Sequence, residues 1–126
     1  MGRVNREIAA EGAAEVELAE GAEAIVCTLN GVDTTTVDDT VVLTAEVPIS
    51  AGVESVLQTV RIRRTSATGA EVAKAELTTV ASTKHVVTLS AIDKPGEIAG
   101  GKYVVTLEGT ATKVTKALKA TLRALV

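Results

Sequence analysis

Apolar and polar residues alternate along most of this chain, and from about residue 25 the alternation has a period of two. In residues 41–47, for example, Val, Leu, Ala and Val alternate with Val, Thr and Glu. Similar runs occupy residues 56–63, 73–78, 86–91 and 103–108. Successive side chains of a strand point to opposite faces, so this alternation predicts strands that bury one face. The 18 Thr residues add to the preference for strands.

Turn-forming residues separate these runs. Asn30-Gly31 is a dipeptide typical of tight turns. Residues 93–96 have Pro and Gly where a type II turn prefers them, and residues 48–52 are expected to close a strand. The whole pattern predicts about seven or eight strands at roughly 10–12-residue spacing, which is typical of an antiparallel sandwich or barrel.

Both ends of the chain depart from this pattern. Residues 1–24 are rich in Ala and Glu and are interrupted by Gly2, Gly12 and Gly21, so we expect a partly extended N-terminal arm before a β-sandwich domain of residues 25–126. Within the arm, residues 15–18 alternate and are compatible with a short edge strand. Residues 114–126 fit a strand or a helix by spacing, and the all-β context favours a strand that closes the sheet beside a central strand.

Composition narrows the classes of function. Of the 126 residues 46% are apolar, and 20 Ala and 19 Val make up most of these. The chain contains no Phe or Trp, and Tyr103 is its only aromatic residue. Sites for carbohydrates and single-stranded nucleic acids stack their ligands on aromatic rings, so this composition argues against both. Small Ala and Val side chains each bury little area, so we expect a homo-oligomer in which a partner surface adds burial.

Charge is distributed unevenly along the chain. Residues 1–54 carry 2 basic and 11 acidic side chains (net −9) and residues 55–126 carry 11 basic and 5 acidic ones (net +6), which together give −3. This asymmetry fits two solvated faces of one domain, or complementary surfaces between subunits. The acidic total argues against a nucleic-acid partner. Because no apolar run approaches a membrane span and no signal peptide is recognisable, we expect no membrane association and synthesis in the cytoplasm.

Candidate reactive residues are few. The single Cys27 lies in an apolar run and the single His85 begins a predicted strand, and neither has a nearby group that would make it catalytic. Asp33, Asp38 and Asp39 lack the further ligands of a calcium loop. We therefore expect no catalytic residues, no cofactor, no metal site and no enzymatic activity.

The densest basic cluster is Arg61, Arg63 and Arg64. Arg61 and Arg63 share one face of a predicted strand. There they are expected to be solvated and balanced by Glu71 or Glu76 of the next strand, or to form a salt bridge between subunits.

Four stretches carry a resemblance to a known family: residues 40–48 (TVVLTAEVP), 58–64 (QTVRIRR) followed by Thr68-Gly69, 100–109 (GGKYVVTLEG) and 120–126 (ATLRALV). Their order and spacing resemble those of small jelly-roll head decoration proteins, which stabilise bacteriophage capsids. The resemblance covers residues 40–126 and concerns the pattern of strands, without a signature motif.

This resemblance implies an antiparallel jelly-roll-like β-sandwich that forms a homotrimer on the exterior of a virion. It implies the major capsid protein of the phage shell as the partner, synthesis in the host cytoplasm, and no catalytic residue. The candidate partner-binding residues are Arg3 and Arg6 of the arm and Arg61 and Arg63 of the basic strand face. The alternative is a β-sandwich domain of a phage tail or head fibre, with a role in receptor binding or adhesion.

Overall fold

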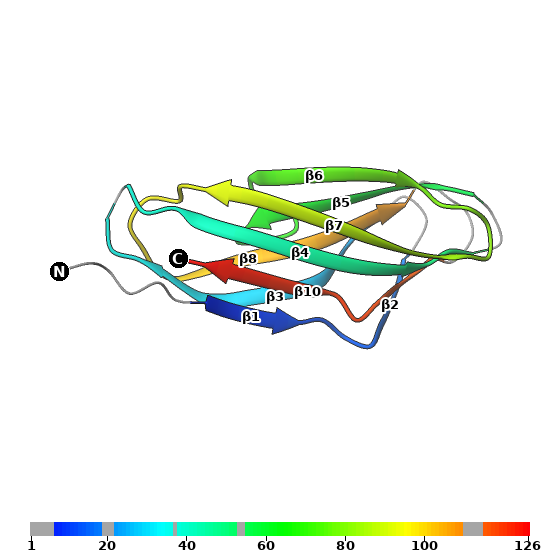
Figure 1. Ribbon diagram of the computed structural model, residues 1–126, viewed down its shortest axis with the longest axis horizontal. Helices are drawn as coiled ribbons and strands as arrows, with labels where there is room; N and C mark the ends of the chain where they lie inside the picture. Colours follow the sequence, from blue (N-terminus) through cyan, green and yellow to red (C-terminus); the bar gives the residue numbers. More distant parts are fainter. Residues whose placement is uncertain (1–6, 19–21, 37, 53–54, 110–114) are drawn as a thin grey trace.

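The computed structural model of the chain describes residues 7–18, 22–36, 38–52, 55–109 and 115–126. Within these residues it contains ten strands and no helix (Figure 1). The strands are β1 (Glu7–Glu11), β2 (Glu15–Leu18), β3 (Glu23–Thr34), β4 (Val41–Ser50), β5 (Leu57–Arg64), β6 (Glu71–Thr78), β7 (Lys84–Asp93), β8 (Ile98–Gly109), β9 (Thr115–Leu118) and β10 (Thr121–Leu125). The predicted all-β class is confirmed.

These strands form two antiparallel sheets that pack face to face (Figure 1). In the six-stranded sheet the order is β1-β10-β4-β9-β2, and β7 pairs with the other side of β4. In the four-stranded sheet the order is β3-β8-β5-β6. Neighbours within each sheet are often distant in sequence, as in a jelly roll, so the predicted antiparallel jelly-roll-like sandwich is confirmed.

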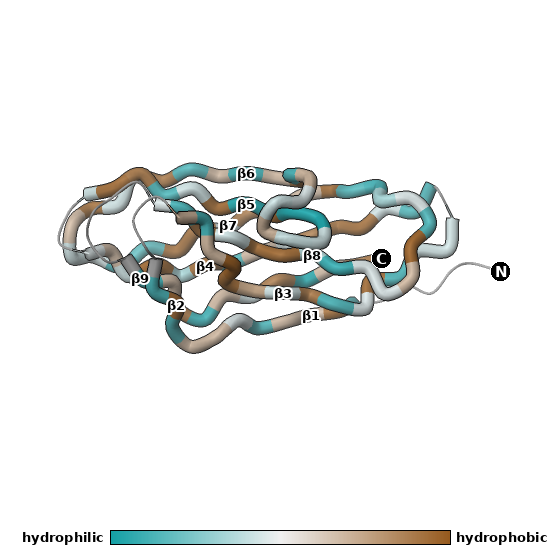
Figure 2. The backbone as a smooth tube through the Cα atoms, turned by 180° about the vertical axis from the view of Figure 1, so that it is seen from behind, coloured by the Kyte–Doolittle hydropathy of each residue, from teal (hydrophilic) through white to brown (hydrophobic). Residues whose placement is uncertain are grey.

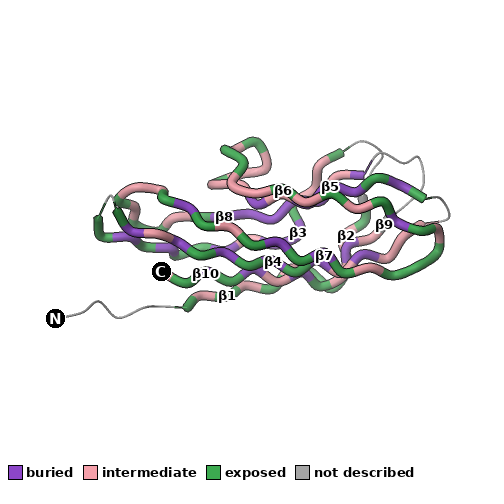
Figure 3. Tube along the Cα trace, turned by 45° about the horizontal axis from the view of Figure 1, so that its top comes forward, coloured by how far each residue is buried: buried purple, intermediate pink, exposed green. Residues whose placement is uncertain are grey.

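The core lies between the two sheets and is built from the alternating apolar positions (Figure 2). The inward side chains of β4 are all fully buried: Val41, Leu43, Ala45, Val47 and Ile49. Figure 3 shows the same alternation of buried and exposed residues along the neighbouring strands. Tyr103 of β8 is 1% exposed and is the largest fully buried side chain among the described residues, so the only aromatic ring anchors a core made otherwise of aliphatic side chains.

The segment predicted as an arm before the sandwich differs in the structure. Within residues 7–18, β1 pairs with β10 and β2 pairs with β9, so this segment supplies edge strands of the six-stranded sheet. A short alternation explains this placement, because Ile8 and Ala10 pack against the core while Glu7 and Glu11 are exposed. The compatible edge strand at residues 15–18 is confirmed as β2.

The connection between β1 and β2 requires a glycine. The N–H of Gly12 donates a hydrogen bond to the carbonyl oxygen of Ala120 at 2.8 Å. A Cβ at position 12 would lie only 1.9 Å from the carbonyl oxygen of Val26. A larger residue would force this connection away from β3, so Gly12 allows β1 to close one side of the sandwich.

The C-terminal segment forms strands, as the sequence favours. β9 and β10 are separated at Lys119-Ala120, and β10 lies between β1 and the central strand β4. Leu122 and Ala124 are both fully buried. Their burial between strands on both sides explains why the period of two prevails over the helical spacing of the same segment.

The tight turn predicted at Asn30-Gly31 is wrong. Both residues lie inside β3, where the pairing with β8 shifts register between Leu29 and Val32. Gly31 has a φ of +77°, which a glycine adopts without strain. The dipeptide therefore bends a long strand at a bulge, and it does not join two strands.

The strand end predicted at residues 48–52 is confirmed, because β4 includes Pro48 and ends at Ser50. On one side, β4 pairs with β10 through residues 42–46 and with β9 through Ile49 and Ser50. Pro48 lies between these two stretches. A proline is tolerated there because neither β10 nor β9 requires its missing N–H.

Candidate functional site

The basic strand face predicted from the sequence belongs to the outer face of the four-stranded sheet. Arg61 and Arg63 of β5 lie there with only 18% of each side chain exposed. Arg63 Nε and Nη2 donate to the two carboxylate oxygens of Glu23 of β3, at 3.0 and 3.2 Å. Arg61 Nη1 donates to Glu23 Oε1 at 3.2 Å, and the hydroxyl of Thr106 donates to the same oxygen at 2.7 Å. One carboxylate thus gathers two guanidinium groups and a hydroxyl.

Arg61 extends this cluster to the remaining strands of the sheet. Its Nη1 donates to Glu108 of β8 at 2.9 Å, and its Nε donates to Glu71 of β6 at 2.9 Å. We call Glu23, Arg61, Arg63, Glu71, Thr106 and Glu108 the charged brace, because these side chains connect all four strands.

The brace changes the protonation behaviour of its members. Burial alone would raise the pKa of Glu23, but the hydrogen bonds from Arg63 and Thr106 and the nearby positive charges lower the pKa below its ordinary value. The hydrogen bond to Glu108 raises the pKa of Arg61 further above its already high value. Both groups are therefore held in their charged forms, as an ion-pair network requires.

The structure brings two of the four predicted partner-binding residues together. Arg61 and Arg63 share one face, and the expected balance by Glu71 of the next strand is confirmed. Their guanidinium groups are engaged by carboxylates of the same chain, so a partner approaching this face meets paired charges. Arg3 and Arg6 lie outside the described residues.

A second charged group connects the two sheets at one end of the sandwich. Tyr103 of β8 donates its hydroxyl to Asp93 Oδ2 at 2.6 Å, and Arg64 Nε of β5 donates to the same oxygen at 2.8 Å. Arg64 Nη2 also pairs with Asp93 Oδ1. Because Asp93 ends β7 of the six-stranded sheet, this cluster holds one sheet to the other.

The pKa values of Asp93 and Tyr103 in this cluster are shifted in opposite directions. Burial alone would raise the pKa of Asp93, but the hydrogen bonds from Arg64 and Tyr103 lower it below its ordinary value. Burial, together with the carboxylate of Asp93, raises the pKa of the Tyr103 hydroxyl far above its usual range. The ring therefore keeps its proton and remains a hydrogen-bond donor.

This cluster was not predicted from the sequence, although a signal was present. Arg64 continues the inward series of Val60 and Ile62 on β5, and Asp93 continues the inward series of Leu89 and Ala91 on β7. A charged residue at an inward position of a strand needs a partner of opposite charge. Two such positions on different strands predict an ion pair between the sheets.

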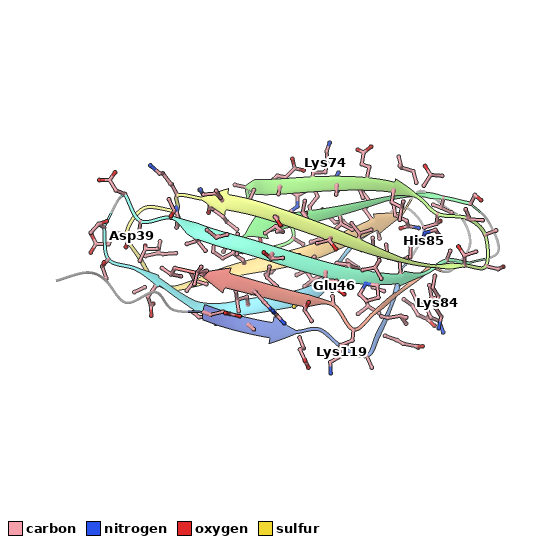
Figure 4. All side chains as sticks on the ribbon, in the orientation of Figure 1. Asp39, Glu46, Lys74, Lys84, His85 and Lys119 are labelled. Atoms are coloured by element: carbon pink, nitrogen blue, oxygen red, sulfur yellow. The ribbon has the colours of Figure 1, made fainter. Side chains whose placement is uncertain are left out.

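The other candidate residues hold local structure. The buried Cys27 directs its thiol to the carbonyl oxygen of Ala10 at 3.5 Å, and burial raises the pKa of that thiol. His85 Nε2 lies 2.7 Å from the hydroxyl of Thr83. The carboxylate of Asp39 accepts hydrogen bonds from the loop that precedes it, including the N–H of Thr35 at 2.7 Å. Figure 4 shows Asp39 and His85 at opposite ends of the sandwich.

Two features are absent from the described part of the chain. Within it, no group of three or more His, Cys, Asp or Glu side chains is placed to hold a metal ion. Nor does any helix there have the length and apolar character needed to cross a membrane.

Comparison with known structures places the fold among the antiparallel sandwiches of viral capsid proteins. No known family and no curated protein matches the sequence itself. A capsid chain in the T13 particle of infectious bursal disease virus superimposes with a TM-score of 0.72 over 97% of this chain, at 11% sequence identity. The VP2 subviral particle of the same virus gives a TM-score of 0.69 over 97% of this chain, at 9% identity.

The fold also occurs outside viruses. A carbohydrate-binding module from Clostridium stercorarium, determined with cellobiose, matches with a TM-score of 0.50 over 86% of this chain and 72% of its own length, at 12% identity. By contrast, this chain spans only 31% and 33% of the two viral chains. At these identities the comparisons establish the fold alone.

Proposed function

We propose that this chain is a non-enzymatic structural protein of a virion, which decorates an assembled bacteriophage head and stabilises it. The observation that carries this proposal is the fold, because a jelly-roll-like sandwich similar to viral capsid domains is what the resemblance of the strand pattern to head decoration proteins leads one to expect. The side chains that first suggested chemistry also support it. Cys27 and Asp39 both make contacts that hold local structure.

The proposed mechanism is stabilisation by selective binding. A protein that binds the assembled shell, and not its separated subunits, lowers the free energy of the assembled state. At a free concentration about 100 times the dissociation constant, the gain is about 2.7 kcal/mol for each bound copy. The proposed partner is the major capsid protein, and the resemblance implies a homotrimer on the capsid exterior.

Co-sedimentation tests this proposal. Purified protein is mixed with assembled phage heads, and separately with unassembled capsid protein, and each mixture is centrifuged through a sucrose gradient. We expect co-migration with heads only, and cryo-EM density for the protein on the outside of the shell. Absence of added density on saturated heads would overturn the proposal.

The alternative is a fibre domain that binds a host surface, and the likeness to a carbohydrate-binding module favours examining it. Sugar recognition by stacking needs an exposed aromatic ring, but Tyr103 is the only aromatic residue and is 1% exposed. Binding to host cells in the absence of heads, measured by flow cytometry with labelled protein, would support this alternative over decoration.

A further inference from the structure

Both edges of the four-stranded sheet, and the edge of the six-stranded sheet formed by β1 and β2, are protected against pairing with other strands. β6 carries charged Glu71, Lys74 and Glu76 along its exposed positions. β3 is interrupted by shifts in register. β1 and β2 each carry two glutamates in a stretch of four or five residues. Charged side chains and bulges are the devices by which edge strands avoid unwanted pairing.

β7 is the remaining edge, and it lacks these devices. Its hydrogen-bonded partner is β4 on one side, and no other strand pairs with it in the described residues. From His85 to Ile92 it contains no charged residue, no Pro and no Gly, if His is counted as neutral. Its pairing with β4 is continuous from Lys84 to Asp93 without a shift in register. It is therefore a long, regular strand with an unpaired side.

Two outward side chains of β7 are among the most exposed large apolar ones of the described residues. Ile92 is 71% exposed and Val86 is 59% exposed. Val80, in the connection that leads to β7, is also 59% exposed, whereas the other exposed large apolar side chains of the described residues do not exceed 43%. An uncharged edge that carries exposed apolar groups favours contact with another strand.

The sequence of β7 is complementary to itself when read in the antiparallel direction. If Leu89 of one copy lies opposite Leu89 of a second copy, then Val86 lies opposite Ile92, and Thr88 lies opposite Ser90. Each apolar residue on the outer face thus meets an apolar residue, and each hydroxyl meets a hydroxyl. Such pairs stabilise antiparallel strands.

We propose that β7 is a self-association edge, through which two copies of this chain pair antiparallel about a two-fold axis and join their six-stranded sheets. The contact is isologous, because both copies contribute the same strand. It is independent of shell binding. If the associating unit is a single chain, the contact forms a dimer. If that unit is the proposed homotrimer, the contact links two trimers.

The test uses like charges placed directly opposite each other. In a Thr88→Lys/Ser90→Lys variant each new lysine faces a lysine of the second copy, and in a Thr88→Glu/Ser90→Glu variant glutamates face glutamates. Both positions are exposed, so folding should be retained, which circular dichroism checks. The matched control is Thr44→Lys, on the same face but on β4, beside Ser90.

Sedimentation velocity at several protein concentrations gives the result. We expect the wild-type chain and the Thr44→Lys control to reach twice the mass of either double variant, with self-association weakened about tenfold or more in each variant. An equimolar mixture of the two double variants should recover the doubled mass, because Lys then faces Glu.

Two outcomes overturn this proposal. In one, the double variants sediment like the wild type, or the mixture does not recover the doubled mass. In the other, the wild-type chain has the same mass as the double variants at every protein concentration. If the wild type does not self-associate but binds heads, and the double variants fail to bind heads, the edge pairs with a strand of the shell instead of a second copy.

Discussion

The charged brace and the β7 edge are two surface regions of the same sandwich with opposite properties. On the outer face of the four-stranded sheet, Arg61 and Arg63 are only 18% exposed and are paired with acidic side chains of the same chain. On β7, Val86 and Ile92 are more than half exposed, and the unpaired side of the strand carries no charge between them. One region satisfies its polar groups internally, and the other leaves its backbone and apolar groups available.

This difference assigns the stability of the fold to the brace and the association with other chains to the β7 edge. The brace is a network of hydrogen bonds and ion pairs that connects four strands, so changes in it should affect unfolding. An exposed edge contributes little to the folded monomer, so changes in β7 should affect association. Each of the following predictions would sharpen or contradict this division.

The largest expected effect is from Glu23→Ala. This change leaves two largely buried guanidinium groups without their shared carboxylate, so we expect the free energy of unfolding to fall by about 2 kcal/mol. Urea denaturation at pH 7 measures it. The control is Glu71→Ala at the exposed rim of the brace, where 41% of the side chain is accessible and the expected loss is below about 0.5 kcal/mol. Equal losses in the two variants would contradict the central role of Glu23.

Tyr103→Phe should have the next largest effect. It removes a buried hydroxyl that donates to Asp93, while Arg64 still pairs with that carboxylate, so we expect a loss of about 1.5 kcal/mol. Urea denaturation again provides the measurement. A change within about 0.5 kcal/mol would mean that the contact between the sheets depends on Arg64 alone.

Acidification should weaken both charged clusters. The pKa values of Glu23 and Asp93 in the folded protein are below their ordinary values of 4.5 and 3.8, so their contribution is fully present above those values and is lost as the pH falls through the lowered ones. We therefore expect the melting temperature to fall from about pH 5 downward. The Glu23→Gln/Asp93→Asn variant should be less stable at pH 7 and show a shallower dependence on pH. Parallel curves for the two proteins would contradict this assignment.

The smallest expected effect on folding is from Ile92→Thr on β7. The side chain is 71% exposed and threonine retains a preference for strands, so the free energy of unfolding should change by less than about 0.5 kcal/mol. The measurement is urea denaturation of a dilute sample, in which self-association is negligible. A loss above about 1 kcal/mol would show that this edge is part of the folded core.

Most of the fold follows from the period of two. The inward residues of β4 and β8 were predictable because each alternation is long and rich in β-branched residues. β1 was not predicted, because its alternation covers only five residues and its Ala and Glu prefer helices when considered alone. Asn30-Gly31 was misinterpreted because a positive φ serves a bulge as well as a turn.

The contacts of the candidate residues were less predictable, because they depend on the order of strands. Arg61 and Arg63 share a strand face by parity, but Glu23 lies 38 positions before Arg61 and meets it only because β8 lies between β3 and β5. The contact between Arg64 and Asp93 crosses between the sheets, so local spacing could indicate that each needs a partner without naming it.

The position of β10 has a consequence for how the chain folds during synthesis. Among the strands of the described residues β10 is made last, yet it lies between β1, which is made before the others, and β4. Until residues 121–125 have left the ribosome, these two strands have unpaired sides that face each other across a gap. Completing the six-stranded sheet is therefore a late event that depends on contacts between distant parts of the sequence, a topology associated with slow folding. Nascent chains that stall before this point expose two additional strand edges, which makes them the species most prone to aggregate.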